Sequence, residues 1–183
     1  MRMAVVVGST RPGRRAPVIA DWVMERARDR SDATFELVDL AHEALPMLDE
    51  SQPPSLGRYE HEHTRRWAAR IEAFDGFVFV TPEYNHSTSA ALKNALDFVY
   101  AQWNNKAAGF VSYGSAGGVR AVEHLRLICA ELQMATVRTQ VALYLDADFV
   151  NYGEFKPREG AQSRLDEMLT QTISWARALQ SVR

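Results

Sequence analysis

The sequence contains a single cysteine, Cys129, so no disulfide bond can form within the chain. It has no apolar run near the roughly 18 residues that a membrane-spanning helix needs. Its first residues, 1–8, are too few for a secretory signal peptide and have no cleavage site. The net charge of −2 offers no positive excess for nucleic acid or an anionic membrane. These absences favour a cytoplasmic protein that binds neither nucleic acid nor membrane.

The length and composition are those of one folded domain. A chain of 183 residues lies within the usual size of a single domain and buries enough surface on folding to form its own core. Hydrophobic residues make up 46% and charged residues 24%, which are ordinary values for a globular protein. No internal repeat or low-complexity segment divides the chain, so we expect residues 1–183 to form one domain.

Apolar runs and helical patterns alternate along the chain. Short β-branched runs such as 3–7 and 76–81 are typical of strands buried on both faces. Apolar residues three and four positions apart predict helices between these runs. The prediction has strands at 3–7, 34–40, 76–81, 106–113 and 136–145, helices at 16–27, 60–74, 88–100, 119–132 and 161–179, and irregular loops at 41–58 and 146–157. This alternation predicts a parallel sheet covered by helices on both faces, with the ligand beyond the carboxyl ends of the strands.

The turn after the first strand has the composition of an anion-binding loop. The segment 8–16 is GSTRPGRRA, in which hydroxyls can donate hydrogen bonds and glycines allow a sharp turn. Three arginines crowd the start of the next helix, where unpaired N–H groups already carry positive charge. An anion between them would make this arrangement favourable. The alternative is a solvated basic turn whose arginines pair with carboxylates elsewhere. The segment matches neither a Walker A loop nor the dinucleotide fingerprint.

The loop after the third strand is suited to a heterocyclic ring. The segment 81–87 is TPEYNHS. The amide of Asn85 can both donate and accept hydrogen bonds, and the ring of Tyr84 can stack on another ring. The alternative is a proline-containing turn that Ser87 or Thr88 caps before the next helix.

The loop after the fourth strand leaves backbone donors free. The segment 113–118 is YGSAGG, and its last two glycines open the next helix. They permit close approach of the backbone and expose N–H groups, which suits a group that gains negative charge. The alternative is a flexible strand–helix turn.

Together the three loops resemble those of the NADPH-dependent FMN reductase family, which includes azo-, quinone- and chromate-reducing flavoproteins. The resemblance covers nearly the whole chain. It rests on GSTR at 8–11, PEYN at 82–85 with LKNALD at 92–97, and GG at 117–118 followed by HLR at 124–126. It implies a flavodoxin-like α/β fold, a three-layer sandwich with a five-stranded parallel sheet of order 2-1-3-4-5.

The resemblance also implies which residues contact FMN. Those of the first turn hold the phosphate: Ser9, Thr10, Arg11, Arg14, Arg15 and Ala16. The isoalloxazine ring is lined by Pro82, Glu83, Tyr84 and Asn85, and Ser115, Gly117 and Gly118 lie at its pyrimidine end. Many members carry a small hydroxyl residue in place of Arg14 and an asparagine in place of Ala16. We therefore expect Arg14 or Arg15 to supply phosphate contacts here.

The activity that the resemblance implies is reduction of a small-molecule acceptor. NADPH or NADH reduces bound FMN, which then reduces a quinone, an azo compound, a metal or free flavin at the same ring face. The amides of Gly117 and Gly118 would stabilise negative charge on the reduced flavin. This chemistry requires no acid–base residue, so we assign no catalytic side chain and no metal ligand.

The alternative function is electron transfer by a flavodoxin-like protein that takes electrons from a partner protein. The arginine-rich turn and the net charge of −2 favour the enzyme, because flavodoxins tend to have a Ser/Thr-rich loop and a strongly acidic surface. A third possibility is a flavin-free binding domain. Family members are commonly dimers or tetramers, so we expect a homodimer or homotetramer, with Tyr100 and Trp103 as contact residues or as core aromatics.

Overall fold

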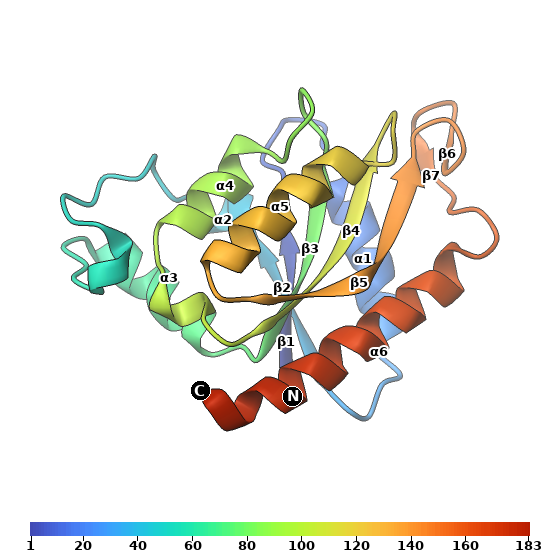
Figure 1. Cartoon of the computed structure of the whole chain (residues 1–183). Coiled ribbons are helices and arrows are strands. Elements are labelled where there is room, and N and C mark those ends of the chain that lie inside the picture. The colour runs from blue at the N-terminus through green and yellow to red at the C-terminus, as the bar shows by residue number, and fades with distance from the viewer.

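The computed structural model describes residues 1–183 and has a parallel sheet between two layers of helices (Figure 1). The strands are β1 (Arg2–Val7), β2 (Thr34–Asp39), β3 (Gly76–Pro82), β4 (Ala107–Gly114) and β5 (Ala135–Tyr144). Their order is β2-β1-β3-β4-β5, and every pair is parallel. The predicted fold class and strand order are therefore confirmed.

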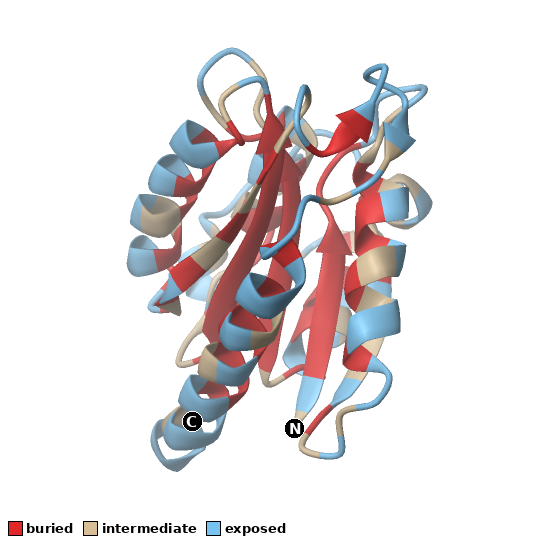
Figure 2. Ribbon diagram, turned by 90° about the vertical axis from the view of Figure 1, so that its right-hand side faces the viewer, coloured by how far each residue is buried: buried red, intermediate tan, exposed pale blue.

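The helices cover both faces of the sheet (Figure 2). One layer contains α1 (Ala16–Ala27) and α6 (Ala161–Leu179), and the other contains α3 (Glu62–Glu72), α4 (Ala90–Asp97) and α5 (Val119–Glu131). Three short 3-10 turns complete the helical elements, at Pro54–Leu56, Ala101–Trp103 and Gln180–Val182. No helix is both long enough and apolar enough to cross a membrane.

Two segments that we expected to be irregular contain regular structure. The first predicted loop, 41–58, includes most of the short helix α2 (Leu40–Glu43) and one 3-10 turn. The second, 146–157, includes an antiparallel hairpin of β6 (Phe149–Val150) and β7 (Glu154–Phe155). Both were missed because elements of two to four residues are too short to show a hydrophobic period.

Alternate residues of the inner strands β1, β3 and β4 enter two separate cores. On the side of α3, α4 and α5, Phe77, Phe79 and Phe110 pack with the two buried tryptophans Trp67 and Trp103. Valines of the same strands pack on the other side against α1 and α6. Trp103 is 1% exposed, so it is a core aromatic and not a surface contact. Cys129 is also fully buried. Two-sided burial explains why these strands are continuous apolar runs.

Strand β5 forms one edge of the sheet, and arginine side chains bind its outer carbonyl groups. Arg126 donates to the carbonyls of Val137 and Arg138 at 2.8 and 3.2 Å. Arg164 donates to Gln140 O at 3.2 Å, and Arg158 donates to Ala142 O at 3.0 Å. The edge is thus covered by side chains from α5, α6 and the loop before α6.

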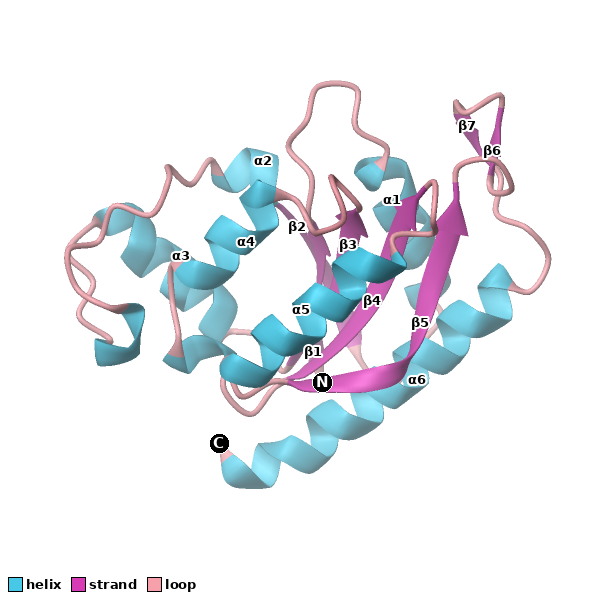
Figure 3. Ribbon diagram, turned by 45° about the horizontal axis from the view of Figure 1, so that its top comes forward, coloured by secondary structure: helices cyan, strands magenta, loops and turns pink.

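The strand order brings three loops together. Strands β1, β3 and β4 are neighbours, and all three are parallel. The loops that leave their carboxyl ends therefore lie at the same end of the sheet, as Figure 3 shows. These are the three loops with unusual sequences.

Candidate functional site

The turn between β1 and α1 is held against the sheet by its first glycine. The amide of Gly8 donates to Val80 O at 2.9 Å. A Cβ atom at this position would lie 2.9 Å from the same carbonyl and 3.0 Å from a methyl group of Leu92. Only glycine allows this approach, which brings the turn beside β3.

A type II β-turn then reverses the chain. The amide of Arg14 donates to Arg11 O at 3.1 Å across Pro12 and Gly13, and Gly13 has a φ of +67°. Proline at the second position and glycine at the third are the residues that this turn type favours. The turn leaves Arg11 exposed at its start and places Arg14 and Arg15 directly before α1.

The start of α1 has unpaired donors. Its N-cap residue, Arg15, makes no side-chain cap, and the first turn contains no acidic residue. The amides of Ser9, Thr10, Arg11 and Ala16 form no hydrogen bond within the protein. Arg11 has no carboxylate partner, and its guanidinium lies 5.9 Å from the centre of the Tyr84 ring. Unpaired N–H groups at a helix start, with a free arginine beside them, are the elements of an anion site.

Arg14 is bound to a carboxylate of the protein. Its guanidinium donates to both oxygens of Asp39, at 2.6 and 2.7 Å, and to Ser9 O at 2.5 Å. Burial raises the pKa of Asp39, but Arg14 and the amide of Ala41 outweigh that effect and hold it below its ordinary value. Arg14 therefore follows the alternative prediction, in which an arginine of the turn pairs with a carboxylate elsewhere in the protein. The ion pair holds the turn to the end of β2.

Arg15 points toward the β6–β7 hairpin. Its guanidinium donates to Tyr152 O and lies 5.6 Å from the centre of the Phe149 ring. The three arginines of the turn therefore have three different environments. Among them, only Arg11 has no hydrogen-bond acceptor of the protein.

The first turn and the β3–α4 loop are joined by hydroxyl groups. Ser9 is fully buried, and its hydroxyl lies 2.9 Å from the hydroxyl of Tyr84. Tyr113, near the end of β4, also has its hydroxyl buried here, beside Ser9 and the backbone of Ala16. The fit of an anionic ligand rests instead on the backbone amides of the first turn that form no hydrogen bond and on the unpaired guanidinium of Arg11.

The β3–α4 loop forms a tight hairpin around the residues predicted to line the flavin ring. Tyr84 and Ser87 exchange backbone hydrogen bonds at 2.9 and 3.2 Å, and Asn85 and His86 between them have φ values of +48° and +75°. Two such residues define a type I′ turn. The side chain of Asn85 is exposed and makes no internal hydrogen bond. The residue that caps α4 is Ser89, which accepts from Leu92 N at 3.1 Å, and not Ser87 or Thr88.

Glu83 connects this loop to the start of α5. Its carboxylate accepts from Nε of Arg120 at 2.6 Å and from the backbone amide of Arg120 at 3.2 Å. Its side chain is 5% exposed, so the carboxylate is directed toward α5 and away from solvent. Glu83 therefore positions two of the three loops relative to each other, while Pro82 beside it is buried at the end of β3.

The β4–α5 loop contains backbone amides that have no hydrogen-bond partner within the protein. Gly117 and Gly118 have φ values of +67° and +70°, and a Cβ atom on Gly118 would lie 2.7 Å from the side chain of Ser112. The amide of Gly117 donates to Gly114 O at 3.1 Å, so it is engaged within the loop. The amides of Ser115, Ala116 and Gly118 form no hydrogen bond within the protein. These three are the free donors of this loop.

Two cavities of about 500 Å³ each lie on either side of α4. The first is mostly apolar and is lined by Thr10 of the first turn, by Leu40 and Met47 near α2, and by Asn94 of α4. The second lies between α4 and α5 and is lined by Lys93, His124 and the serine and threonine residues 87–89. The first cavity borders the turn between β1 and α1, so α2 and the loop after it form one wall beside the predicted site.

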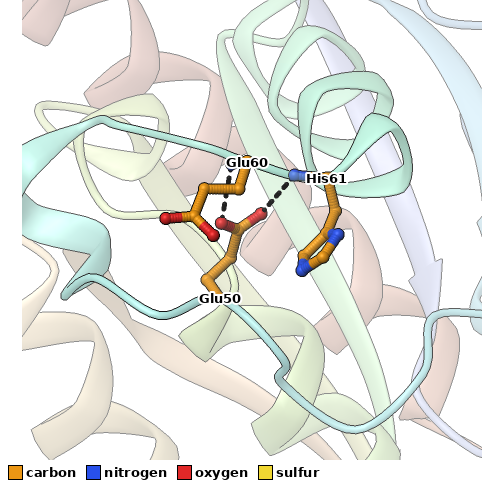
Figure 4. Close-up of side chains that lie close together, drawn as sticks. All are labelled: Glu50, Glu60 and His61. Atoms are coloured by element: carbon orange, nitrogen blue, oxygen red, sulfur yellow. Dashed lines mark hydrogen bonds between the residues drawn. The ribbon is translucent and has the colours of Figure 1, made fainter.

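A cluster of metal-ligand side chains lies away from the three loops. Glu50, Glu60 and His61 bring their ligand atoms within 4.8 Å of one another (Figure 4). The two oxygens of Glu50 accept from the backbone amides of Glu60 and His61, at 2.7 and 3.1 Å. This carboxylate therefore fastens the long loop to the start of α3.

Comparison with known proteins agrees with this geometry. The family model described as NADPH-dependent FMN reductase matches residues 1–148. The chain belongs to this family. An NAD(P)H-dependent FMN reductase of Schizosaccharomyces pombe is 39% identical over 169 residues, covering 91% of this chain and 84% of that protein. An NAD(P)H:quinone oxidoreductase of Solanum tuberosum is 32% identical, covering 85% and 74%.

Two further matches agree with this chain in length or fold. An FMN-dependent NADPH-azoreductase of Staphylococcus saprophyticus is 28% identical over 97% of this chain and 96% of its own. The flavoenzyme NAD(P)H:acceptor oxidoreductase FerB of Paracoccus denitrificans superposes with a TM-score of 0.72 at 21% identity, covering 97% of each chain. At that identity the superposition supports the fold, while the family match rests on the sequence.

Proposed function

We propose that this protein is an FMN-dependent NAD(P)H oxidoreductase that reduces a small-molecule acceptor. FMN, when bound, accepts a hydride from NADPH or NADH and passes the electrons on. The observation that carries the proposal is the convergence of three loops with free donors at the carboxyl ends of β1, β3 and β4, in a chain of the FMN reductase family.

The phosphate group of FMN fits the start of α1. Arg11 supplies a cation without a carboxylate partner, and the unpaired amides of Ser9, Thr10 and Ala16 supply neutral donors. Arg14 acts indirectly. Asp39 fixes its guanidinium, which donates to the Ser9 carbonyl and so maintains the shape of the turn. Arg15 binds the β6–β7 hairpin and makes no contact with the phosphate.

The flavin ring fits between the other two loops. The exposed Asn85 side chain can both donate and accept hydrogen bonds at a ring edge, and its strained turn fixes its position. The free amides of Ser115, Ala116 and Gly118 lie at the start of α5, where the helix dipole favours negative charge. With FMN bound, these amides would supply hydrogen-bond donors to negative charge on the ring, and no side chain would need to transfer a proton.

The acceptor is of the small-molecule class. Relatives are named as quinone reductases and azoreductases. The apolar cavity lined by Met47 and Leu40 borders the first turn and provides an adjoining surface for such a ring. Electron transfer to a partner protein remains the second candidate function, and the experiment below separates the two.

The test is an anaerobic spectrum of the purified protein reconstituted with FMN. The enzyme is expected to lose its flavin absorbance near 450 nm (on the order of seconds for typical turnover) after NADPH or NADH is added. A yellow protein that neither nucleotide bleaches would support the electron carrier. A protein that stays colourless after reconstitution would refute FMN binding.

We also propose a homodimer or homotetramer in the cytoplasm. Apolar side chains of the loop after α2 are exposed without an internal partner, with Met47 at 75%, Leu56 at 54% and Leu48 at 41%. A second copy of the chain would cover such a surface. Light scattering of the eluting protein measures the mass, and a single 20.6 kDa species at micromolar concentration would refute the assembly.

A further inference from the structure

Two short segments bring carboxylates and imidazoles together at the start of α3. Residues 49–50 lie in the long loop after α2, and residues 60–63 lead into the helix. Together they contain four carboxylates and two imidazoles. The ligand atoms of Glu50, Glu60 and His61 lie within 4.8 Å of one another, and Figure 4 shows the Glu50 carboxylate between the other two side chains. Nitrogen and oxygen atoms of these kinds are ligands of transition-metal ions.

The two glutamates of this cluster have no cation as a partner. Glu50 accepts hydrogen bonds from neutral backbone amides, and Glu60 accepts one from the neutral hydroxyl of Ser51. Arg65 donates to the backbone carbonyl of Glu60, but its ion pair is with Glu62. Two carboxylates at this distance repel each other. A bound cation would compensate that repulsion, which no group of the chain does.

Glu50 is charged and fixed in position. Burial raises its pKa, but the Thr64 hydroxyl and the backbone amides of Glu60 and His61 outweigh that effect and hold the pKa below its ordinary value. The two amide bonds are 2.7 and 3.1 Å long, and each goes to a different carboxylate oxygen. Each oxygen therefore keeps a further lone pair for a metal ion.

The imidazole of His61 is oriented by its neighbours. Its Nε2 donates to the carbonyl of Asp49 at 3.1 Å, which leaves Nδ1 with the lone pair that a metal ion requires. The ring stacks on that of His63, with centres 5.2 Å apart and planes at 8° to each other. His63 is itself held, because its Nε2 lies 2.9 Å from a carboxylate oxygen of Asp49. A hydrogen bond from one ring nitrogen to a backbone carbonyl commonly orients metal-binding histidines.

We propose that Glu50, Glu60 and His61 bind Zn²⁺ through two carboxylate oxygens and one imidazole nitrogen, with water as the remaining ligand. The imidazole favours zinc over magnesium and calcium, which prefer oxygen ligands. Three protein ligands with one open position are an established zinc arrangement. The ion would join residue 50 to residues 60 and 61 and so close the loop between them. None of these residues belongs to the three loops of the candidate flavin site, so the proposal does not depend on FMN.

The test is a calorimetric zinc titration of the untagged, full-length protein after a chelator has removed bound metals. One equivalent of Zn²⁺ should bind per chain, and an excess of Mg²⁺ of about a hundredfold should not displace it. The affinity should be the same with and without FMN. The single cysteine, Cys129, is buried and does not compete for the ion.

Single substitutions locate the ion. Glu60→Gln removes a ligand from an exposed side chain and should weaken zinc binding at least about tenfold, and His61→Gln should do the same. The matched control is Glu62→Gln, because this carboxylate is 67% exposed in the same segment and pairs with Arg65. The control should leave zinc affinity within about twofold, as expected for an exposed pair of little energy.

Thermal unfolding separates a metal site from a purely structural contact. Without metal, Glu60→Gln should unfold at or above the wild-type temperature, because the substitution removes a repulsion between two carboxylates. Saturating Zn²⁺ should raise the unfolding temperature of the wild type, since an ion that binds only the folded state stabilises it. The rise should be smaller in Glu60→Gln and unchanged in Glu62→Gln.

Each outcome decides the proposal. It is overturned by the absence of saturable zinc binding, by equal affinities of Glu60→Gln and the wild type, or by displacement of the ion by Mg²⁺. Equal weakening by Glu60→Gln and Glu62→Gln would place the ion elsewhere and also overturn it. If Glu60→Gln does not fold, the comparison of His61→Gln with Glu62→Gln decides. Protein that binds zinc as expected and binds no FMN would refute the proposed function and support this site.

Discussion

Replacing Asp39 by asparagine should destabilise the protein by about 3 kcal/mol. The side chains of Asp39 and Arg14 are 9% and 16% exposed, so the substitution leaves a nearly buried guanidinium without its carboxylate. Removing one partner of a buried pair costs about 3–5 kcal/mol, and the small exposure of this pair places the expected value at the lower end. Asparagine remains a good N-cap, so the bond from the Ala41 amide to this side chain is preserved.

Thermal or urea unfolding of the flavin-free protein measures the effect. At this chain length 1 kcal/mol corresponds to about 2–4 °C, so the midpoint should fall by about 6–12 °C. The matched control is Asp166→Asn, which breaks a similar two-bond pair with Arg26 at the surface, where the side chains are 36% and 40% exposed. That change should cost less than about 1 kcal/mol.

The dependence on pH identifies the ion pair as the cause. The pKa of Asp39 is lowered in the folded protein, so its charge stabilises the fold at pH values above the unfolded pKa of about 4. This stabilisation is lost as the pH falls through the lower, folded pKa. The difference between wild type and Asp39→Asn should therefore be constant from about pH 5 to 8 and shrink below about pH 4.

Two results would refute this reasoning. One is a loss of stability no greater than that of Asp166→Asn, which would mean that the pair carries little energy. The other concerns the role of Arg14 in binding. If Asp39→Asn tightens the binding of FMN, the freed guanidinium reaches the phosphate, and Arg14 is a ligand and not a support of the turn.

Further predictions concern single side chains. Arg11→Ala should weaken FMN binding by about 1–3 kcal/mol in fluorescence titrations and leave riboflavin unaffected, whereas Arg15→Ala should change neither affinity by more than about twofold. Burial lowers the pKa of Lys106 to about 8, so the free energy of unfolding should rise between about pH 8 and 10.5, where only the unfolded chain holds the proton; denaturant titrations of Lys106→Met should show no such rise. Gly118→Ala should lower the unfolding temperature, because its φ is +70° and the new Cβ would lie 2.7 Å from Ser112; an unchanged temperature would contradict the required backbone shape.

The sequence predicted the sheet well because its inner strands are buried on both faces. The runs 3–7 of β1 and 77–80 of β3 are apolar at every position, and helices with a clear apolar face separate the strands. Parallel strands with right-handed connections allow few arrangements, and the resemblance to the FMN reductases selected the observed order. The short helix α2 and the β6–β7 hairpin carry no such periodic signal.

The sequence indicated which loops form the candidate site, but not which residues their side chains bind. Segment 8–16 was correctly placed at a helix start, yet the pairing of Arg14 with Asp39 joins residues that lie 25 positions apart. Nothing in the local sequence distinguishes Arg14 from Arg11.

The arginines along β5 determine how this protein can associate with other chains. An exposed edge strand is a template on which a further strand can add, in aggregation or in continuous sheets between subunits. Here three guanidinium groups occupy the carbonyls that such a strand would need. Sheet extension at this edge would first have to displace all three, at a cost in charge-assisted hydrogen bonds. Any association of this chain with another is therefore directed away from the β5 edge of its sheet.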